Sequence, residues 1–158
     1  VPYFGICLGM QTAVIEYARN VLKYADANSS EFNPDSKHCV IDIMPDHQGK
    51  KMGGTLRRGA YPCLCLGDIM KSAYGEGTIS ERHRHRYEFN NDFRDELVKA
   101  GLVIAGTSPD GTLVEAVEIP KNDFYIGVQF HPEFKSRPQS AHPVFREFIK
   151  AAVKKSTK

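Results

Sequence analysis

The sequence predicts an α/β fold, because short strand patterns alternate with helical patterns along the chain. Three stretches carry this prediction. Residues 1–6 form an apolar run, and helical spacing of apolar residues begins at residue 8. A pattern typical of a buried strand occupies 124–130 ("FYIGVQF"), and an amphipathic helical pattern follows at 143–154. A chain of 158 residues is long enough to enclose a core between such layers.

The elements between these stretches follow from turn and breaker residues. The first helix is predicted over 8–25, and the Ser, Asn and Pro residues of 27–35 end it. A strand at 40–44 ("VIDIM") stops at Pro45. The remaining predictions, in chain order, are a flexible loop at 45–54, extended pieces at 55–57 and 62–66, a short helix at 69–74, an extended or loop segment at 78–89, a helix at 92–100 followed by Gly101, and a hairpin of 102–108 and 113–119 around Pro109, Asp110 and Gly111.

Composition argues against membrane and nucleic-acid functions. The apolar runs are far too short to span a bilayer, and the formal net charge is only +2. The basic run at 82–87 is short, is flanked by two glutamates, and alternates as a strand does, which favours fixed ion pairs or one bound carboxylate over a nucleic-acid surface. Four cysteines without a secretory signal fit a reducing, cytoplasmic compartment. Cys63 and Cys65 would share one strand face, as two small buried side chains rather than a metal or redox pair.

The stretch Gly5-Ile6-Cys7-Leu8-Gly9 indicates a nucleophile. G-x-C-x-G where a strand gives way to a helix has the layout of the G-x-S-x-G nucleophile elbow. Glycines two residues to either side would relieve the clashes of such a sharp turn. Cys7 would then lie at a helix N-terminus, an environment that lowers a thiol pKa, and the Leu8 amide could donate to an oxyanion. The alternative is a buried structural cysteine beside helix-packing glycines.

His131 is the histidine best placed to serve such a thiol. It directly follows the predicted strand at 124–130 and opens His131-Pro132-Glu133. Side chains two apart in an extended segment point to the same side, so Glu133 could orient His131 as a general base. The alternative is a structural histidine at a strand end.

"GICLGMQ" together with "VQFHPE" resembles the class I (triad) glutamine amidotransferases. The resemblance implies a flavodoxin-like or Rossmann-like sheet with helices on both faces. It also implies Cys7 as nucleophile, His131 as general base and acid, and Glu133 as its orienting partner. The implied reaction attacks the glutamine side-chain amide, releases ammonia from a γ-glutamyl thioester, and then hydrolyses the thioester to glutamate.

Three further segments resemble the CTP synthase family: "ANSSEF" (27–32), "MGGTLRRGA" (52–60) and "ERHRHRYEFNN" (81–91). The match implies that Arg86 holds the α-carboxylate of L-glutamine and that Glu31 holds its α-ammonium group. It further implies that the same pocket is lined by Leu8, Gly9, Met10 and Gln11. Without that match, surface ion pairing is the simpler interpretation of Glu31 and Arg86. Arg57 and Arg58 stay unassigned, with solvated or inter-domain charge as the default, and the loop at 45–54 is a candidate lid.

The chain begins inside an apparent core strand, which predicts a piece of a longer protein. By the resemblance, residues 1–158 are part of a glutaminase domain whose first half would supply a second oxyanion-hole amide. This piece alone is expected to be weak or inactive, and an open sheet edge would lie beside its first strand. ATP, Mg²⁺ and UTP would bind in a synthetase domain outside the chain, GTP would act as an allosteric activator, and the whole protein would form a tetramer.

Two other interpretations stay open. The first is a γ-glutamyl hydrolase of the same fold, which would cleave γ-glutamyl peptides rather than release ammonia from free glutamine. The second is a catalytically silent regulatory module, which would have no need of Cys7, His131 and Glu133 together.

Overall fold

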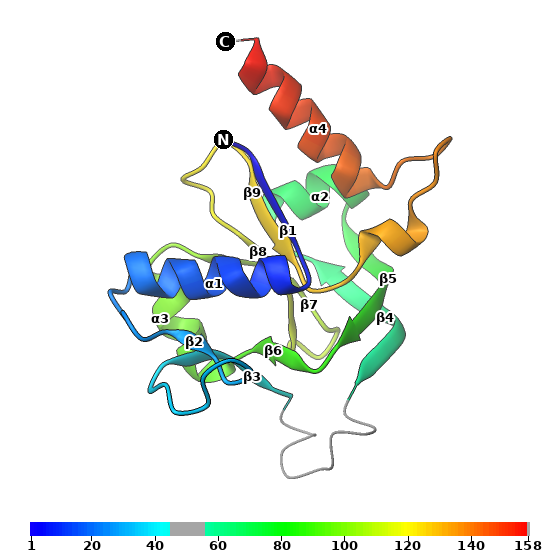
Figure 1. Cartoon of the computed structure of the whole chain (residues 1–158). Helices are drawn as coiled ribbons and strands as arrows, with labels where there is room; N and C mark the ends of the chain where they lie inside the picture. The colour runs from blue at the N-terminus through cyan, green and yellow to red at the C-terminus, as the bar shows by residue number, and fades with distance from the viewer. Residues whose placement is uncertain (45–55, 158) are drawn as a thin grey trace.

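The structure is a computed structural model that describes residues 1–44 and 56–157 (Figure 1). Six strands form one sheet in the order β1-β9-β8-β7-β4-β5, and three form a second sheet in the order β2-β3-β6. The strands are β1 (Tyr3–Ile6), β2 (Asn28–Ser29), β3 (Cys39–Ile43), β4 (Arg57–Cys65), β5 (Gly77–His85), β6 (Tyr87–Phe89), β7 (Val103–Thr107), β8 (Val114–Glu118) and β9 (Tyr125–Val128). The helices are α1 (Leu8–Asn20), α2 (Asp68–Tyr74), α3 (Arg94–Lys99) and α4 (Pro143–Ser156), with 3-10 turns η2 (Asn91–Phe93) and η3 (Pro132–Lys135).

The predicted α/β class is confirmed, and the larger sheet is mixed. β1 and β9 pair in parallel, whereas the other strand pairs of that sheet are antiparallel. The predicted hairpin at 102–119 is present as β7 and β8. Helices lie on both faces of this sheet: α1 and α3 on one side, α2 and α4 on the other (Figure 1).

Some predicted boundaries were wrong. Arg57 and residues 62–65 of the two predicted extended pieces belong to one strand, β4, which pairs along its whole length with β5. The basic segment at 78–89, predicted as extended or loop, is extended and forms strands β5 and β6. The first helix stops at Asn20, because the chain reverses soon afterwards at Lys23, whose φ of 65° is left-handed. Residues 45–54, the candidate lid, lie outside the described residues.

Two apolar cores fill the space on either side of the sheet. One contains Met10 and Val14 of α1 together with Leu97 of α3. The other contains Cys63 and Cys65 of β4 under α2 and α4. Both of these thiols are buried on one strand face, as the two-residue spacing predicts. The alternation of strand side chains between the two cores fixes which residues reach each face.

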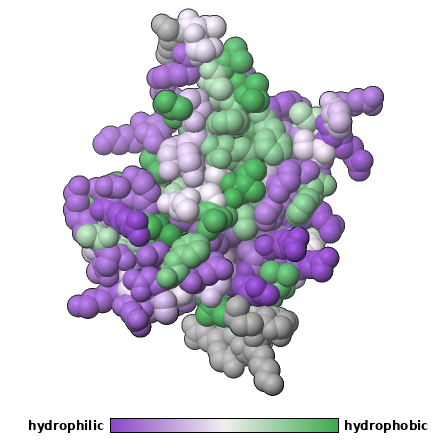
Figure 2. All heavy atoms as spheres, viewed as in Figure 1, coloured by the Kyte–Doolittle hydropathy of each residue, from purple (hydrophilic) through white to green (hydrophobic). Residues whose placement is uncertain are grey.

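One end of the sheet is apolar at its surface. Among the described strands, β1 pairs only with β9, so its other edge presents unpaired backbone groups. Figure 2 shows apolar surface running from α4 toward the centre of this face, and Ile149 and Val153 of α4 are more than half exposed. None of the described helices has the length and apolar character needed to cross a bilayer.

Candidate active site

Cys7 lies at the junction of β1 and α1 in a strained backbone conformation. Its φ of 51° and ψ of −103° lie in a region that L-residues other than glycine rarely adopt. Such a conformation costs on the order of 1–3 kcal/mol and persists where the surrounding structure enforces it, often at functional sites. The Cys7 backbone N–H donates to the Val128 carbonyl oxygen at 2.8 Å, which ties the turn to the end of β9. The predicted sharp elbow is therefore present.

The two glycines that flank Cys7, Gly5 and Gly9, differ in whether a larger side chain would fit in their place. A Cβ on Gly5 would come within 2.6 Å of the Gly9 carbonyl carbon, so the close approach of α1 to β1 requires glycine there. A Cβ on Gly9 would meet only the Tyr3 hydroxyl, at an ordinary 3.8 Å. The prediction that both glycines relieve a clash is confirmed for Gly5 and wrong for Gly9.

The Cys7 thiol has a raised pKa, which corrects the expectation of a lowered one. Burial raises the pKa of Cys7 above its ordinary 9.0, and the Glu133 and Glu88 carboxylates add to the rise. Hydrogen bonds from the Leu8 N–H and from Gln129 work in the opposite direction but do not overcome burial. The helix N-terminus acts on the thiol as expected, yet desolvation outweighs it. At neutral pH the resting sulfur is therefore protonated, and a nucleophilic reaction requires a base.

His131 and Glu133 are hydrogen-bonded to each other. Their Nδ1 and Oε1 atoms are 2.6 Å apart, and Pro132 holds the backbone between them at the start of η3. His131 is partly buried and stacks on the Phe134 ring, with centroids 5.2 Å apart. The parallel pairing of β1 with β9 ends at Ile6 and Val128, so the segment that carries His131 leaves the sheet beside the Cys7 turn. Within the described part of the chain, His131 Nε2 has no hydrogen-bond partner.

A pocket of about 280 Å³ opens beside Cys7. Its lining includes five of the predicted site residues: Cys7, Leu8, Gln11, Glu31 and Arg86. The remaining lining residues are Phe32, Leu56, Arg84, His85 and Tyr87. The fold thus brings together groups from α1, from the turn after β2, and from the connection between β5 and β6. Two of these groups, Glu31 and Arg86, have opposite charge.

Two predicted pocket residues are not among those that line the pocket. Met10 is fully buried, and its side chain belongs to the core under α1, in close contact with Gly127. Gly9 is also absent from the lining. Helical geometry explains the difference, because Leu8 and Gln11 are three residues apart and face the same side, whereas Met10 turns toward the sheet.

Arg57 is buried in a cluster of charged and titratable residues, which corrects its default assignment as a solvated charge. It is 8% exposed, and its Nη1 lies 3.4 Å from a carboxylate oxygen of Glu88 and 2.5 Å from one of Glu115. His85 Nε2 lies 2.9 Å from Glu88, and His83 Nδ1 lies 3.6 Å from Glu115. We call these five residues the Arg57 cluster. Its ion pairs are those of Arg57, whereas His83 and His85, the members of the basic run that join it, are neutral near pH 7.

The outer face of β5 differs from its inner face. Arg82 and Arg84 are exposed and alternate with the buried His83 and His85, and Arg58 of β4 is exposed opposite Arg84. Sequence reasoning did not assign the Arg57 cluster. The alternation of arginine and histidine at 82–85 was the one available signal, since it indicates which of these side chains face inward.

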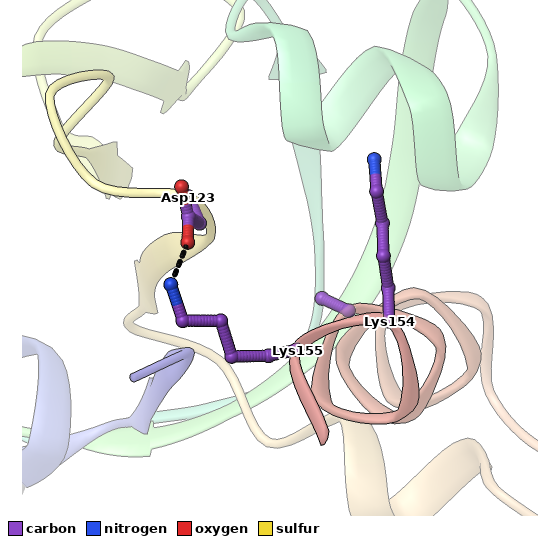
Figure 3. Close-up of a pocket in the computed structure, with 4 residues that line it drawn as sticks. Asp123, Lys154 and Lys155 are labelled. Atoms are coloured by element: carbon purple, nitrogen blue, oxygen red, sulfur yellow. Dashed lines mark hydrogen bonds and ion pairs between the residues drawn. The ribbon is translucent and has the colours of Figure 1, made fainter. Parts of the chain in front are cut away.

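A second hollow lies between α4 and the turn before β9 (Figure 3). It is lined by Asp123, Ala151, Lys154 and Lys155, and Lys155 Nζ lies 2.7 Å from Asp123. It holds no cysteine or histidine, so it lacks the groups of the Cys7 pocket. Elsewhere too, residues 1–44 and 56–157 present no cluster of three histidine, cysteine or acidic side chains that could hold a metal ion.

The chain matches the family model "Glutamine amidotransferase class-I" over residues 1–151. The matched range contains the Cys7 turn, the pocket beside it and the His131–Glu133 pair, and it ends within α4. The chain therefore belongs to the class I glutamine amidotransferase family.

Within this family, the chain is similar to CTP synthases. It is 61% identical over 155 residues to the CTP synthase of Clostridium kluyveri and 60% identical over 156 residues to that of Carboxydothermus hydrogenoformans. These matches cover 97% and 98% of the chain but only 29% of each relative. The Trypanosoma brucei CTP synthase glutaminase domain, solved with bound acivicin, superimposes with a TM-score of 0.92 at 45% identity, over 98% of this chain and 61% of that one.

Proposed function

We propose that this chain is the part of a CTP synthase glutaminase domain that binds and hydrolyses L-glutamine. The observation that carries this proposal is the pocket beside Cys7, whose lining combines the Cys7 thiol with the acidic Glu31 and the basic Arg86. Free glutamine is a zwitterion with a side-chain amide. A pocket with these three groups suits each of its three polar ends.

Arg86 and Glu31 would bind the backbone end of glutamine. The Arg86 guanidinium would hold the α-carboxylate, and its Nε has no hydrogen-bond partner among the described residues. The exposed Glu31 carboxylate would hold the α-ammonium group. A γ-glutamyl peptide with a free α-amino group carries the same two charges, so the protection experiment below is what separates it from free glutamine.

Cys7 would carry the covalent step. Its sulfur attacks the δ-carbonyl carbon of glutamine while His131 Nε2 accepts the thiol proton, and Glu133 holds the resulting imidazolium in place. The Leu8 N–H stabilises the negative charge that develops on the carbonyl oxygen. The C–N bond then breaks as His131 gives its proton to the departing ammonia. A γ-glutamyl thioester on Cys7 remains.

Water completes the cycle. His131 removes a proton from the water as it attacks the thioester carbon, and the C–S bond breaks to release glutamate. The proton returns from His131 to the Cys7 sulfur. The raised pKa of Cys7 makes this proton exchange with His131 necessary in both halves of the reaction.

The ammonia would serve the rest of the parent protein. Because the chain spans 29% of its CTP synthase relatives, the remaining part would bind ATP, Mg²⁺ and UTP and use the ammonia to aminate UTP to CTP. We further propose that GTP activates the glutaminase step, that the parent protein is a tetramer, and that it acts in the cytoplasm.

The test compares two nitrogen sources in the full-length parent protein. Cys7→Ala removes the nucleophile, so we expect glutamine-dependent activity to fall on the order of 10⁶-fold while activity with added ammonia persists. Cys39→Ala is the matched control, because Cys39 is a free cysteine on β3, away from the lining of the pocket. Loss of both activities in Cys7→Ala would contradict the proposed division of labour.

Labelling with acivicin provides an independent readout, since the similar T. brucei domain was solved with this compound bound. We expect one adduct, on Cys7, and protection by L-glutamine. Protection by γ-glutamyl peptides instead of glutamine would favour a γ-glutamyl hydrolase, and no adduct on Cys7 would favour a silent module.

A further inference from the structure

The mechanism above does not use Gln129, although its side chain contacts the nucleophile. Gln129 follows β9 directly and is fully buried. Its Nε2 donates to the Cys7 sulfur at 3.6 Å, a normal length for a hydrogen bond to sulfur. Its backbone N–H donates to the Glu115 carbonyl oxygen at 2.8 Å, so the residue is anchored to β8.

The neighbours of Gln129 determine which end of its amide faces the sulfur. The side-chain amide of Gln11 lies between Gln129 and the backbone of Tyr87. Gln11 Nε2 is 3.0 Å from the Tyr87 carbonyl oxygen. Because a carbonyl oxygen only accepts, Gln11 must present its NH₂ group there. The same NH₂ group of Gln11 also lies 3.1 Å from the side-chain amide of Gln129. Gln129 must therefore present its oxygen, Oε1, to that NH₂ group. The NH₂ group of Gln129 is then left to face Cys7 as a donor.

We propose that Gln129 is a positioning residue for the Cys7 nucleophile: its carboxamide, oriented by Gln11, holds the sulfur and stabilises the thiolate during attack. This inference rests on the proposed glutaminase function. A donor N–H binds a thiolate more strongly than a thiol, because hydrogen bonds to charged acceptors are stronger. The contact therefore strengthens at the moment when His131 removes the proton.

Other groups also act on the Cys7 sulfur and must be counted in any pH measurement. The Glu133 and Glu88 carboxylates raise its pKa, and the Leu8 N–H lowers it. The pocket wall adds one acidic group, Glu31, and three cationic or titratable groups: Arg84, His85 and Arg86. Gln129→Met leaves all of these in place and adds no charge, so its effect on the pH profile can be assigned to the lost donor.

The test uses Gln129→Met and Gln129→Glu in the full-length protein. Methionine fills a similar volume without a donor, and glutamate places a carboxylate where the donor was. We expect kcat for glutamine hydrolysis to fall roughly 10- to 150-fold in Gln129→Met and further in Gln129→Glu, with KM for glutamine changed less than about threefold. The pH at which Cys7 reacts half-maximally with iodoacetamide should rise in the same order.

Several results would overturn the inference. One is a wild-type kcat and alkylation profile in both variants; another is a rise in KM alone, which would assign Gln129 to substrate binding. A fall in kcat without a shift of the alkylation profile would also count against it. A KM for glutamine close to that of wild type in the two Gln129 variants would show that their pocket is still folded. If Cys7→Ala itself retained glutaminase activity, the proposed function would fail, whereas loss in Cys7→Ala with wild-type behaviour of Gln129→Met would remove only this inference.

Discussion

The histidines near the pocket fall into two groups that differ in burial and in partners. His83 and His85 lie on the inner face of β5, and their side chains are 0% and 3% exposed. His131 lies beyond the end of β9, is 19% exposed, and is bonded to the more exposed Glu133. All three are near a carboxylate. What separates them is the greater exposure of the His131 side chain and the fixed cation, Arg57, beside His83 and His85.

Burial and Arg57 keep the first group neutral. Burial first, and the Arg57 guanidinium second, lower the pKa of His83 to about 2 and that of His85 to about 3. A histidine that does not protonate near pH 7 cannot accept a proton from a thiol. A nearby carboxylate is therefore not enough to identify a catalytic base. The comparison indicates that His83 and His85 support the pocket wall, whereas His131 is suited to proton transfer.

The largest expected effect separates the two groups directly. His131→Gln removes the base but keeps a polar side chain of similar size, so we expect glutamine hydrolysis to fall roughly 10²- to 10⁴-fold. Hydrogen exchange of β5 amides in the full-length protein should stay unchanged. His85→Gln is the matched variant and should instead increase exchange in β5. Faster β5 exchange in His131→Gln would show that both groups are structural.

The next prediction concerns Arg57, the buried cation beside His83 and His85. Arg57→Met leaves the Glu88 and Glu115 carboxylates without their buried partner, which should lower the local opening free energy of β4 and β5 by about 3–5 kcal/mol. Hydrogen exchange of those strands measures this change. Arg58→Met, one residue away on the exposed face, should change it by no more than about 0.5 kcal/mol. Equal effects of the two variants would mean that the ion pairs of Arg57 contribute little.

The sequence predicted the local parts of this site better than the distant ones. The Cys7 turn depends on Gly5 and on the start of α1, and the His131–Glu133 contact spans two residues, so both follow from short patterns. Chain order is enough to predict such features, because the atoms that make them are covalently close. The α/β class likewise followed from local periodicity.

The contacts of Arg57 and Gln129 required the fold. Arg57 meets Glu88 and Glu115 at sequence separations of 31 and 58, and Gln129 meets Cys7 at a separation of 122. These contacts depend on strand register, since a shift of one residue would turn each side chain to the opposite face. The raised pKa of Cys7 was missed for the same reason, because burial by distant segments outweighs the helix N-terminus.

The smallest expected effect concerns acid pH. In the unfolded chain His85 takes up a proton near pH 6.5, but in the folded chain its pKa is about 3. Its contribution to stability is therefore fully present above pH 6.5 and is lost as the pH falls from 6.5 toward 3. Between these values the loss is about 1.4 kcal/mol per pH unit.

The comparison of wild type with His85→Gln isolates this contribution. Glu88 and Glu115 act in the opposite direction, because their raised pKa values favour the folded state as the pH falls, but both proteins share them. We therefore expect the opening free energy of β5, from hydrogen exchange corrected for intrinsic rates, to fall more steeply in wild type by about 1.4 kcal/mol per unit between pH 5.5 and 4. Equal slopes of the opening free energy against pH in wild type and His85→Gln would mean that His85 protonates in the folded state. His85 would then differ less from His131 than its burial indicates.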